Sequence, residues 1–136
     1  MRETPELRSR IMRAVKGTDT SPEMAVRRLV HAMGYRFRLH RQDLPGKPDL
    51  VFPCLRKVIF VHGCFWHGHN CPRGARMPVH NRDYWQAKIA RNVARDKLEL
   101  RRLRALGWKC LVIWECEIRD LRRIRAAIVH FLGRRR

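Results

Sequence analysis

The stretch VHGCFWHGHNC, from Val61 to Cys71, constrains the fold of this chain more than any other. It contains three of the seven histidines and two of the five cysteines, together with two adjacent large aromatic residues. The apolar run from Val58 to Val61 leads directly into it, which indicates a buried strand that ends in a dense polar loop. Binding and catalytic residues often lie on such loops, because a rigid scaffold positions them. We therefore expect the functional site to be built around this stretch.

Cysteine and histidine side chains in this stretch are spaced as ligands of a metal ion. Cys64, His69 and Cys71 form the pattern C-x4-H-x-C, and Cys116 follows a second apolar run that could pair beside the first strand. Thiolate and imidazole groups suit Zn²⁺ better than Mg²⁺ or Ca²⁺, and four such groups complete a closed tetrahedral site. The pattern predicts a structural Zn²⁺ site formed by these four residues. The alternative is a set of buried free thiols beside a solvated histidine.

Two histidines of the stretch are left over if a metal ion takes Cys64 and His69. These are His62 and His67. A metal site would hold the loop rigid and would fix both imidazoles in place. Such an arrangement fits a reaction centre that is stabilised from beneath by a metal site.

The net charge restricts the class of partner. The chain has 136 residues, of which 31 are basic and 12 are acidic, so its formal net charge is +19. An excess of this size favours a polyanionic partner, with nucleic acid as the first candidate. Arginine outnumbers lysine, and its guanidinium group suits contacts with phosphates and bases. A charged surface that serves only solubility is the alternative, but a small domain needs far less charge for that.

Length, apolar segments and cysteines place the chain in a broad class. We expect one domain over residues 1–136, in which residues 1–20 form a basic N-terminal arm or helix that could order on DNA. Met12 of this arm could wedge between bases. No segment approaches the ~20 apolar residues of a membrane-spanning helix, so no membrane association is expected. An odd number of cysteines, and no apolar signal core at Met1 to Pro5, predict a protein of the cytoplasm.

Apolar periodicity and breaker residues predict eight elements in the order ααβββαβα. The expected helices cover residues 5–16, 21–33, 82–106 and 117–132, and the expected strands cover residues 35–39, 48–52, 57–61 and 108–114. Residues 72–81 are expected to form a loop. The order predicts an α/β fold in which a mixed sheet is flanked by helices.

The second expected helix has recognisable start and stop signals. Ser21 is expected to cap it, and Gly34 is expected to end it. Ala25 and Leu29 belong to its expected buried stripe. Glu23 lies in the first turn, where a carboxylate complements the helix dipole.

The long helix expected over residues 82–106 places a carboxylate on its apolar face. Its apolar stripe consists of Trp85, Ile89, Val93, Leu100 and Leu103. Asp96 fills the gap in this stripe and points to the core side, where a carboxylate needs a partner. An arginine could be that partner. His67 is the alternative, because an Asp–His pair would fix the tautomer of the imidazole and raise its basicity.

The start of the second predicted strand connects these features to a known family. Pro48-Asp49 before a strand resembles the first half of the PD-(D/E)xK nuclease core, although Phe60 and His62 stand where that core has an acidic residue and a lysine. This departure, together with the histidine-rich loop and Trp114–Cys116, resembles the very-short-patch repair (Vsr) endonucleases. The resemblance covers nearly the whole chain and includes RS at residues 8–9, MRA at residues 12–14, LPGKPD at residues 44–49, NVARD at residues 92–96 and LGW at residues 106–108.

The resemblance implies a restriction-endonuclease-like DNA nickase. Family members nick one strand of double-stranded DNA beside a T·G mispair that arises when 5-methylcytosine is deaminated. The resemblance implies that Mg²⁺ is bound by Asp49 and by the backbone carbonyl of Val61. His67, oriented by Asp96, is implied as the general base for the attacking water. His62 is implied to contact the scissile phosphate or a water molecule.

The same resemblance implies roles for residues outside this core. Glu23 would be a supporting acidic residue near the metal ions, instead of a residue that only complements a helix dipole. Cys64, His69, Cys71 and Cys116 match the structural Zn²⁺ ligands of the family. Gly68 and Asn70 stand where relatives can carry further histidines, which the Zn²⁺ site does not need.

Three aromatic residues are implied to insert beside the mispair, namely Phe65, Trp66 and Trp85. Ordinary core packing is the alternative. The helical periodicity favours packing for Trp85, whereas Phe65 and Trp66 are adjacent in a glycine-flanked loop and are not expected to face the core together. Unstacking costs a few kcal/mol per base step and costs least at a mismatch, so such a wedge favours damaged sites.

Two other functions remain open from the sequence. One is a restriction-type endonuclease that cuts fully paired DNA, and the other is a zinc-stapled DNA-binding module without catalysis. The presence of Asp49, His62, His67 and Asp96 together disfavours the module. The expected partners are double-stranded DNA with a T·G mispair and further repair proteins. One wedge and a nick on one strand suggest a monomer.

Overall fold

The computed structural model describes residues 20–39, 41–75 and 77–133. In chain order, its elements are α2 (Ser21–Ala32), β1 (Arg38–Leu39), β2 (Leu50–Phe52), a 3-10 turn η1 (Pro53–Leu55), β3 (Lys57–His62), α3 (Pro72–Ala75), α4 (Arg82–Ala105), β4 (Lys109–Trp114), a second 3-10 turn η2 (Glu115–Arg119) and α5 (Leu121–Leu132). None of the helices in these ranges is long and apolar enough to cross a membrane. The expected N-terminal arm with Met12, and the expected helix at residues 5–16, lie outside the described residues.

A mixed sheet in the order β1-β2-β3-β4 forms the centre of the molecule, which confirms the predicted fold class. β1, β2 and β3 are antiparallel neighbours, whereas β3 and β4 are parallel. A parallel pair requires a crossover, and α3 and α4 provide it. In this register His62 lies opposite Trp114, so both strands end at the same edge of the sheet. The loops that follow these two strands therefore begin side by side.

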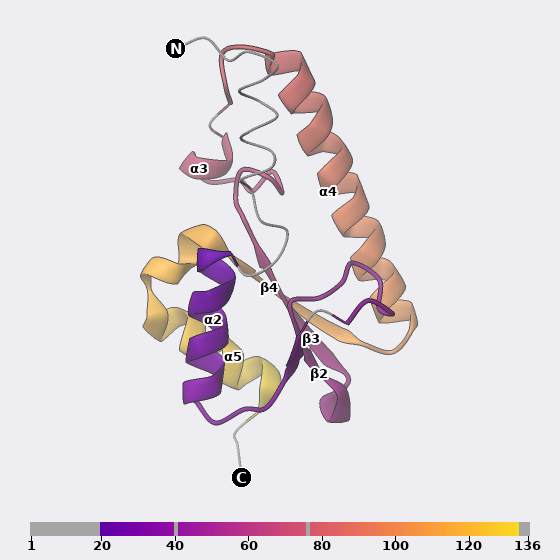
Figure 1. The fold of residues 1–136 in the computed structure, drawn as a ribbon, viewed down its shortest axis with the longest axis vertical. Helices are drawn as coiled ribbons and strands as arrows, with labels where there is room; N and C mark the ends of the chain where they lie inside the picture. Colours follow the sequence, from indigo (N-terminus) through magenta and orange to yellow (C-terminus); the bar gives the residue numbers. More distant parts are fainter. Residues whose placement is uncertain (1–19, 40, 76, 134–136) are drawn as a thin grey trace.

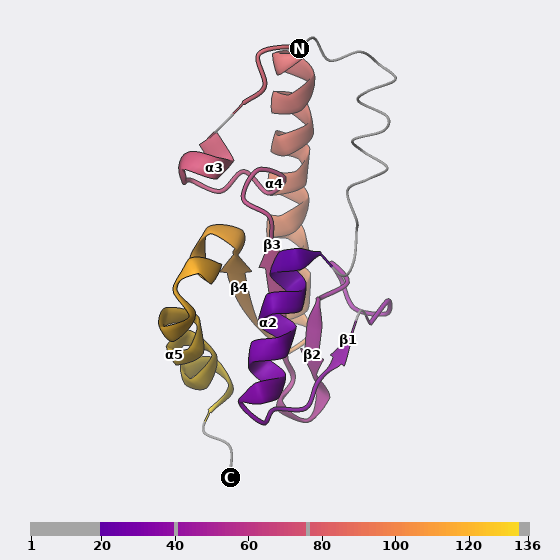
Figure 2. The same ribbon diagram turned by 60° about the vertical axis from the view of Figure 1, so that its left-hand side comes forward.

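Helices cover both faces of the sheet (Figures 1 and 2). α2 and α5 lie on one face, and α4 lies along the other. Side chains alternate between the faces along a strand, and in β3 Ile59 packs with the α2 and α5 side while Val58 and Phe60 pack with the α4 side. Because both faces are covered, the central strand is a continuous apolar run.

The strand expected over residues 35–39 is wrong in its extent, because only Arg38 and Leu39 pair with β2. The backbone at residues 34 and 35 terminates α2 and is therefore not available for pairing with β2. Gly34 has a φ of +94°, and the N–H of Tyr35 donates to the carbonyl of Val30 at 3.3 Å. This is a helix-terminating contact. Instead of pairing in the sheet, Tyr35 is buried in the core beside α2 and α5. Its hydroxyl group donates to the carbonyl of Gly133.

The expected N-cap and buried stripe of α2 are each displaced by one residue. Thr20, and not Ser21, has the extended cap conformation, and its Oγ1 accepts from the N–H of Glu23 at 3.3 Å. The side chains buried deepest are Val26 and Val30, while Leu29 packs at the edge of that stripe. The expected stripe included Ala25, whose small side chain contributes little free energy when it is buried. The larger valines fill the space against the sheet instead.

Two expected boundaries near the ends of the parallel pair also differ. The last helix begins at Leu121 and not at residue 117, because Asp120 caps it by accepting from the N–H of Arg123 at 3.2 Å. Residues 115–119 form the turn η2. The loop expected over residues 72–81 contains one helical turn, α3, which Pro72 starts.

The long helix α4 follows the prediction closely. It ends at Ala105, one residue before the expected end, and buries Trp85, Ile89 and Leu103. Asn81 occupies the cap position, but its side chain makes no capping hydrogen bond. The helix thus carries its predicted apolar stripe against the sheet and the loop after β3.

Candidate functional site

The loop after β3 folds back on itself in a compact turn. The N–H of His67 donates to the carbonyl of Gly63 at 3.2 Å, and the N–H of His69 donates to the carbonyl of Cys64 at 2.9 Å. Gly68 permits this path, because its φ is +61° and a Cβ atom there would lie 2.8 Å from Cγ2 of Val93 on α4. The loop can therefore lie flat against α4.

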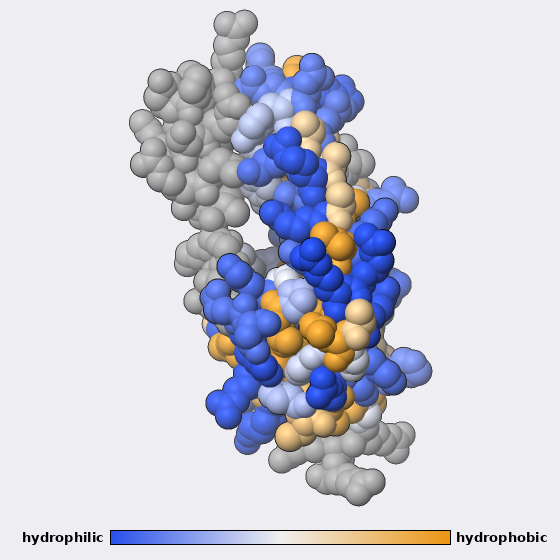
Figure 3. Space-filling model, turned by 90° about the vertical axis from the view of Figure 1, so that its right-hand side faces the viewer, coloured by the Kyte–Doolittle hydropathy of each residue, from blue (hydrophilic) through white to orange (hydrophobic). Residues whose placement is uncertain are grey.

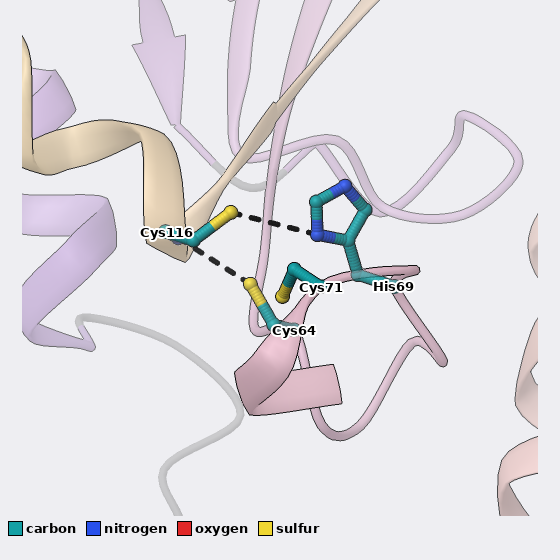
Figure 4. Close-up of side chains that lie close together, drawn as sticks. All are labelled: Cys64, His69, Cys71 and Cys116. Atoms are coloured by element: carbon teal, nitrogen blue, oxygen red, sulfur yellow. Dashed lines mark hydrogen bonds between the residues drawn. The ribbon is translucent and has the colours of Figure 1, made fainter. Parts of the chain in front are cut away.

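The four predicted metal ligands converge in the structure (Figure 4). The Sγ atoms of Cys64, Cys71 and Cys116 and a ring nitrogen of His69 all lie within 4.8 Å of one another. Cys116 comes from η2, directly after β4, and reaches the loop because β3 and β4 end at the same edge of the sheet. Three soft sulfur donors and one imidazole match the ligand preference of Zn²⁺.

Backbone groups around this Cys/His cluster point at its sulfur atoms. The N–H of Cys116 donates to Sγ of Cys64 at 3.3 Å, and the N–H of Gly74 donates to Sγ of Cys71 at 3.3 Å. Burial raises the pKa of the Cys64 thiol to about 12, so a thiolate at this position needs a cation beside it. The donor set therefore fits a bound Zn²⁺ ion, which would stabilise the thiolate form.

A cleft of about 460 Å³ lies between the strand ends, the loop before β2 and α4. Its lining residues are Gln42, Leu44, Gly46, Lys47, Asp49, Phe60, Val61, His62, His67, Arg95, Asp96 and Glu99. The predicted residues Asp49, His62, His67 and Asp96 thus share one cavity. Oδ2 of Asp49 accepts from the backbone N–H of Val61 at 2.6 Å, which ties the carboxylate to the end of β3.

The partner predicted for Asp96 is the one that the structure shows. Nδ1 of His67 lies 2.6 Å from Oδ2 of Asp96, and both side chains are largely buried. A carboxylate at Nδ1 favours the tautomer that keeps its proton there, so Nε2 is left as the basic nitrogen. The arrangement is that of a general base with an orienting carboxylate.

His62 stacks on His67 and has a different character. The ring centroids are 3.8 Å apart and the planes differ by 4°. His62 is 7% exposed, and burial lowers its pKa from 6.5 to about 4, with the neighbouring His67 acting in the same direction and Asp96 against it. Its Nδ1 atom is buried without a hydrogen-bond partner among the described residues. His62 is therefore a neutral imidazole at neutral pH.

The three aromatic residues expected at the mispair form one cluster. Phe65 and Trp66 are half-buried, and both pack on Trp85, with centroid distances of 5.8 and 5.7 Å. Neither Phe65 nor Trp66 belongs to the two core clusters that the described residues form, and the two rings meet edge to face beside the same indole. Trp85 is 3% exposed, and Asn92 holds the loop by donating to the carbonyl of Trp66 at 2.9 Å.

Glu23 is the one predicted catalytic residue that is not among the described residues lining the cleft. Glu23 is 2% exposed and forms an ion pair with Arg27 at 2.9 Å, one turn later on α2. Met12 lies outside the described residues.

Three charged residues of the cleft were not predicted from the sequence. Lys47 precedes Asp49 and has a φ of +47°, while Arg95 and Glu99 flank Asp96 on α4. Burial and the charge of Asp96 raise the pKa of Glu99. Glu99 could have been predicted as a residue of the cleft from its spacing to Asp96, because residues at i and i+3 lie on the same side of a helix.

Comparison with known proteins identifies the family of this chain. Residues 2–73 match the family described as DNA mismatch endonuclease Vsr. The type II nicking enzyme V.XorIIP of Xanthomonas oryzae pv. oryzae is 51% identical, over 95% of this chain and 94% of its own length. The DNA mismatch endonuclease Vsr of Escherichia coli is 43% identical, over 82% of this chain and 71% of its own length. The type II nicking enzyme V.NmeAIP of Neisseria meningitidis is 38% identical, over 86% and 83%.

Proposed function

The chain belongs to the Vsr family of DNA mismatch endonucleases, and we propose that it nicks one strand of duplex DNA beside a T·G mispair in a reaction that requires Mg²⁺. The mispair would arise by deamination of 5-methylcytosine, and the nick would start a short repair patch. Membership makes the chain a nuclease that acts on DNA. The observation that carries the finer proposal is the His67–Asp96 pair in one cleft with Asp49.

His67 is the proposed general base. Hydrolysis of a phosphodiester needs a water molecule that loses its proton as it attacks the phosphorus. Nε2 of His67 can accept that proton, because Asp96 holds the other nitrogen and stabilises the cation that forms. One P–O ester bond of the strand breaks as the new P–O bond forms, and the departing oxygen takes up a proton from solvent. His67 then returns its own proton to solvent.

Asp49 and the backbone carbonyl of Val61 are the groups that we propose to hold Mg²⁺. Carboxylate and carbonyl oxygens are the ligands that Mg²⁺ prefers, and the ion keeps several waters when protein ligands are few. When bound, Mg²⁺ supplies positive charge that neutralises the phosphate. The short contact from the Val61 N–H holds Asp49 at the end of β3, beside the residue whose carbonyl is the second proposed oxygen donor.

His62 and Glu23 have supporting roles in the proposal. A neutral imidazole is able to donate one hydrogen bond without adding charge, so His62 suits a contact with the scissile phosphate or with a nearby water. Glu23 is buried beside Arg27 and not in the cleft wall. We propose that it acts on the site through the end of α2, as a supporting carboxylate.

Recognition of the mispair is proposed for the aromatic cluster. Phe65 and Trp66 would enter the base stack, and the buried Trp85 would support them from beneath, with Met12 as a second wedge. The Cys/His cluster, loaded with Zn²⁺, would fix the loop that carries them. Insertion costs a few kcal/mol of stacking, and the cost is lowest where pairing is already weakened. We further propose that a monomer carries out one nick and that repair proteins take over the nicked product.

The test is a cleavage assay on end-labelled duplexes that contain a T·G mispair in varied flanking sequence, beside the same duplexes fully paired. Purified protein is assayed with Mg²⁺ and with EDTA. We expect a single nick in the T strand of the mispaired duplex, which depends on Mg²⁺. The Asp49→Asn variant is expected to bind DNA without nicking it.

Other outcomes would redirect or remove the proposal. Double-strand cutting of paired DNA would place the protein among restriction-type endonucleases. Binding without a cut in every context would leave a DNA-binding module. Full cleavage by Asp49→Asn would remove Asp49 from the metal site.

A further inference from the structure

Trp114, the last residue of β4, lies between the Cys/His cluster and the two stacked histidines of the cleft. We propose that Trp114 is a positioning residue, which holds the planes of His62 and His67 against the metal-binding loop. The inference rests on the proposed function, because it concerns how the general base His67 is oriented. It gives the Cys/His cluster a role in catalysis beyond stabilising the fold.

On one side, Trp114 contacts a predicted metal ligand. Its indole stacks on the imidazole of His69 with a centroid distance of 4.1 Å and an interplanar angle of 15°. His69 is held in turn at Nδ1, which lies 3.5 Å from Sγ of Cys116. A metal ion at this cluster would therefore fix the imidazole on which the indole rests.

On the other side, Trp114 meets both histidines of the cleft. The centroid of its ring lies 5.2 Å from that of His62 at 75°, and 6.4 Å from that of His67 at 71°. Both are edge-to-face contacts, a favoured geometry for aromatic rings because the positive edge of one ring meets the negative face of the other. His69, Trp114 and the two parallel histidines thus form one row of rings that ends at Asp96.

The position of Trp114 is fixed by the backbone. It pairs with His62 across the parallel strands, and its N–H donates to Oε1 of Glu117 at 2.8 Å. The ring of Phe60 closes the other side of His62 at 5.5 Å. The strand pairing and this hydrogen bond thus fix the backbone from which the indole projects.

The two histidines need such packing, because hydrogen bonds do not define their planes. The contact of His67 with Asp96 involves one ring nitrogen, and rotation about that contact would still carry Nε2 away from a water molecule. The buried Nδ1 of His62 has no hydrogen-bond partner among the residues that the structure describes. Their orientation therefore depends on the rings that touch them. A displacement of about 1 Å at a reacting group can lower a rate by about 100-fold.

The test compares Trp114→Leu with Trp114→Phe, in protein loaded with Zn²⁺. Trp114→Leu removes the flat ring, and we expect kcat for nicking to fall by about 10- to 100-fold with little change in KM. Trp114→Phe keeps a ring that can stack on His69, and we expect it to restore most of kcat. Zinc content, measured by atomic absorption, is expected to stay the same in both.

Trp108→Leu is the matched control, because Trp108 lies just before the other end of β4. It is 7% exposed, packs in the core on the α4 side and lies beneath the guanidinium group of Arg56 at 5.4 Å. The substitution is expected to lower thermal stability at least as much as Trp114→Leu. It should leave kcat unchanged below the unfolding temperature.

A second readout does not depend on turnover. In nuclear magnetic resonance spectra, the Nδ1 proton of His67 is expected to broaden in Trp114→Leu and to stay sharp in Trp114→Phe and Trp108→Leu. A sharp resonance and an unchanged kcat in Trp114→Leu would overturn the inference. So would equal losses of kcat in Trp114→Leu and Trp108→Leu. If the unsubstituted protein nicks no DNA, the proposed function fails, and the spectra still decide whether Trp114 positions His67.

Discussion

The two stacked histidines show how the environment can differ between two neighbouring residues of one type. His67 has a carboxylate at Nδ1, is about one-quarter exposed and lines the cleft. His62 is buried beside it, and its pKa is held at about 4. Two neighbouring imidazoles would repel each other if both were charged. Burial resolves this by keeping one of them neutral.

Asp96→Asn tests the proposed role of His67 as the general base. The amide can no longer stabilise a protonated His67, so we expect kcat for nicking to fall by roughly 100-fold or more, with DNA affinity kept. Single-turnover nicking on the T·G duplex measures the effect. Asp83→Asn is the control, since Asp83 lies exposed in the first turn of the same helix. A loss of less than twofold in Asp96→Asn would exclude the pair from proton transfer.

The low pKa of the buried His62 predicts that the free energy of unfolding depends on pH. The pKa of His62 is lower in the folded chain, about 4, than its ordinary value of 6.5. Between these pH values, His62 is protonated in the unfolded chain but not in the folded chain. The contribution of neutral His62 to the free energy of unfolding is therefore complete above pH 6.5 and is lost as the pH falls toward 4. The loss amounts to about 3 kcal/mol.

Urea unfolding between these pH values measures that loss. In His62→Phe the free energy of unfolding should depend less steeply on pH, whereas His130→Phe, at an exposed position, should keep the slope of the unsubstituted protein. Identical slopes in all three proteins would show that His62 titrates normally. A metal ion bound at the Cys/His cluster would also be released in acid, so the comparison between variants, and not the absolute slope, carries the result.

At the scale of elements, the loop after β3 depends on the short helix α3. The N–H of Gly74 donates to Sγ of Cys71. A Cβ atom at position 74 would lie 1.8 Å from the carbonyl oxygen of His69 and 3.0 Å from that of Cys64. Since the obstacles are backbone atoms of the loop itself, a side chain here would force α3 away from the Cys/His cluster.

Gly74→Ala is therefore expected to weaken metal binding. Loss of the N–H···S contact and displacement of α3 should lower Zn²⁺ affinity by about 10- to 100-fold, as loss of groups around metal ligands commonly does. Competition with a chromophoric chelator measures it. Gly63→Ala is the control in the same loop, where the nearest atom to an added Cβ is Cδ1 of Trp66 at an ordinary 3.5 Å. Equal affinities in the two variants would contradict this account of α3.

At the scale of the whole molecule, exposed basic residues lie on both sides of the sheet, and those of α4 adjoin the cleft. Figure 3 shows the side on which α4 lies, with hydrophilic side chains along much of the helix. Arg91, Arg95, Lys97 and Arg101 are exposed on this helix, and Arg95 also lines the cleft. Arg125, on α5, lies on the other side of the sheet. DNA that is seated in the cleft should therefore meet the charges of α4 and not those of α5.

Salt titration of DNA binding tests this placement of the DNA. Affinity for duplex DNA should fall by at least ~1,000-fold between ~50 and ~200 mM salt, because several phosphates displace their counterions. Arg91→Gln, one helical turn from Arg95, should reduce the slope of log affinity against log salt by about one unit. Arg125→Gln should leave the slope unchanged. A larger change in Arg125→Gln would place the DNA on the opposite face.

Local patterns in the sequence were sufficient for most of the elements, for the fold class and for the four residues of the Cys/His cluster. The apolar run of β3, the stripe of α4 and the spacing C-x4-H-x-C each act over a few residues. Apolar side chains in such a run or stripe are buried in most folds, because burial removes them from water. The pairing of Asp96 with His67 was one of two possibilities that the sequence left open, because a carboxylate in an apolar stripe needs a partner and an arginine could also have supplied it.

Only the tertiary structure decided what depends on distances between segments. The short β1, the capping of α2 by Thr20 and the turn η2 result from competition for backbone hydrogen bonds, which local patterns do not weigh. The packing of Phe65 and Trp66 on one indole, the place of Glu99 in the cleft and the position of Trp114 between two sites depend on the parallel register of β3 and β4. That register brings together residues about 50 positions apart in the chain, and no pattern within either segment specifies it.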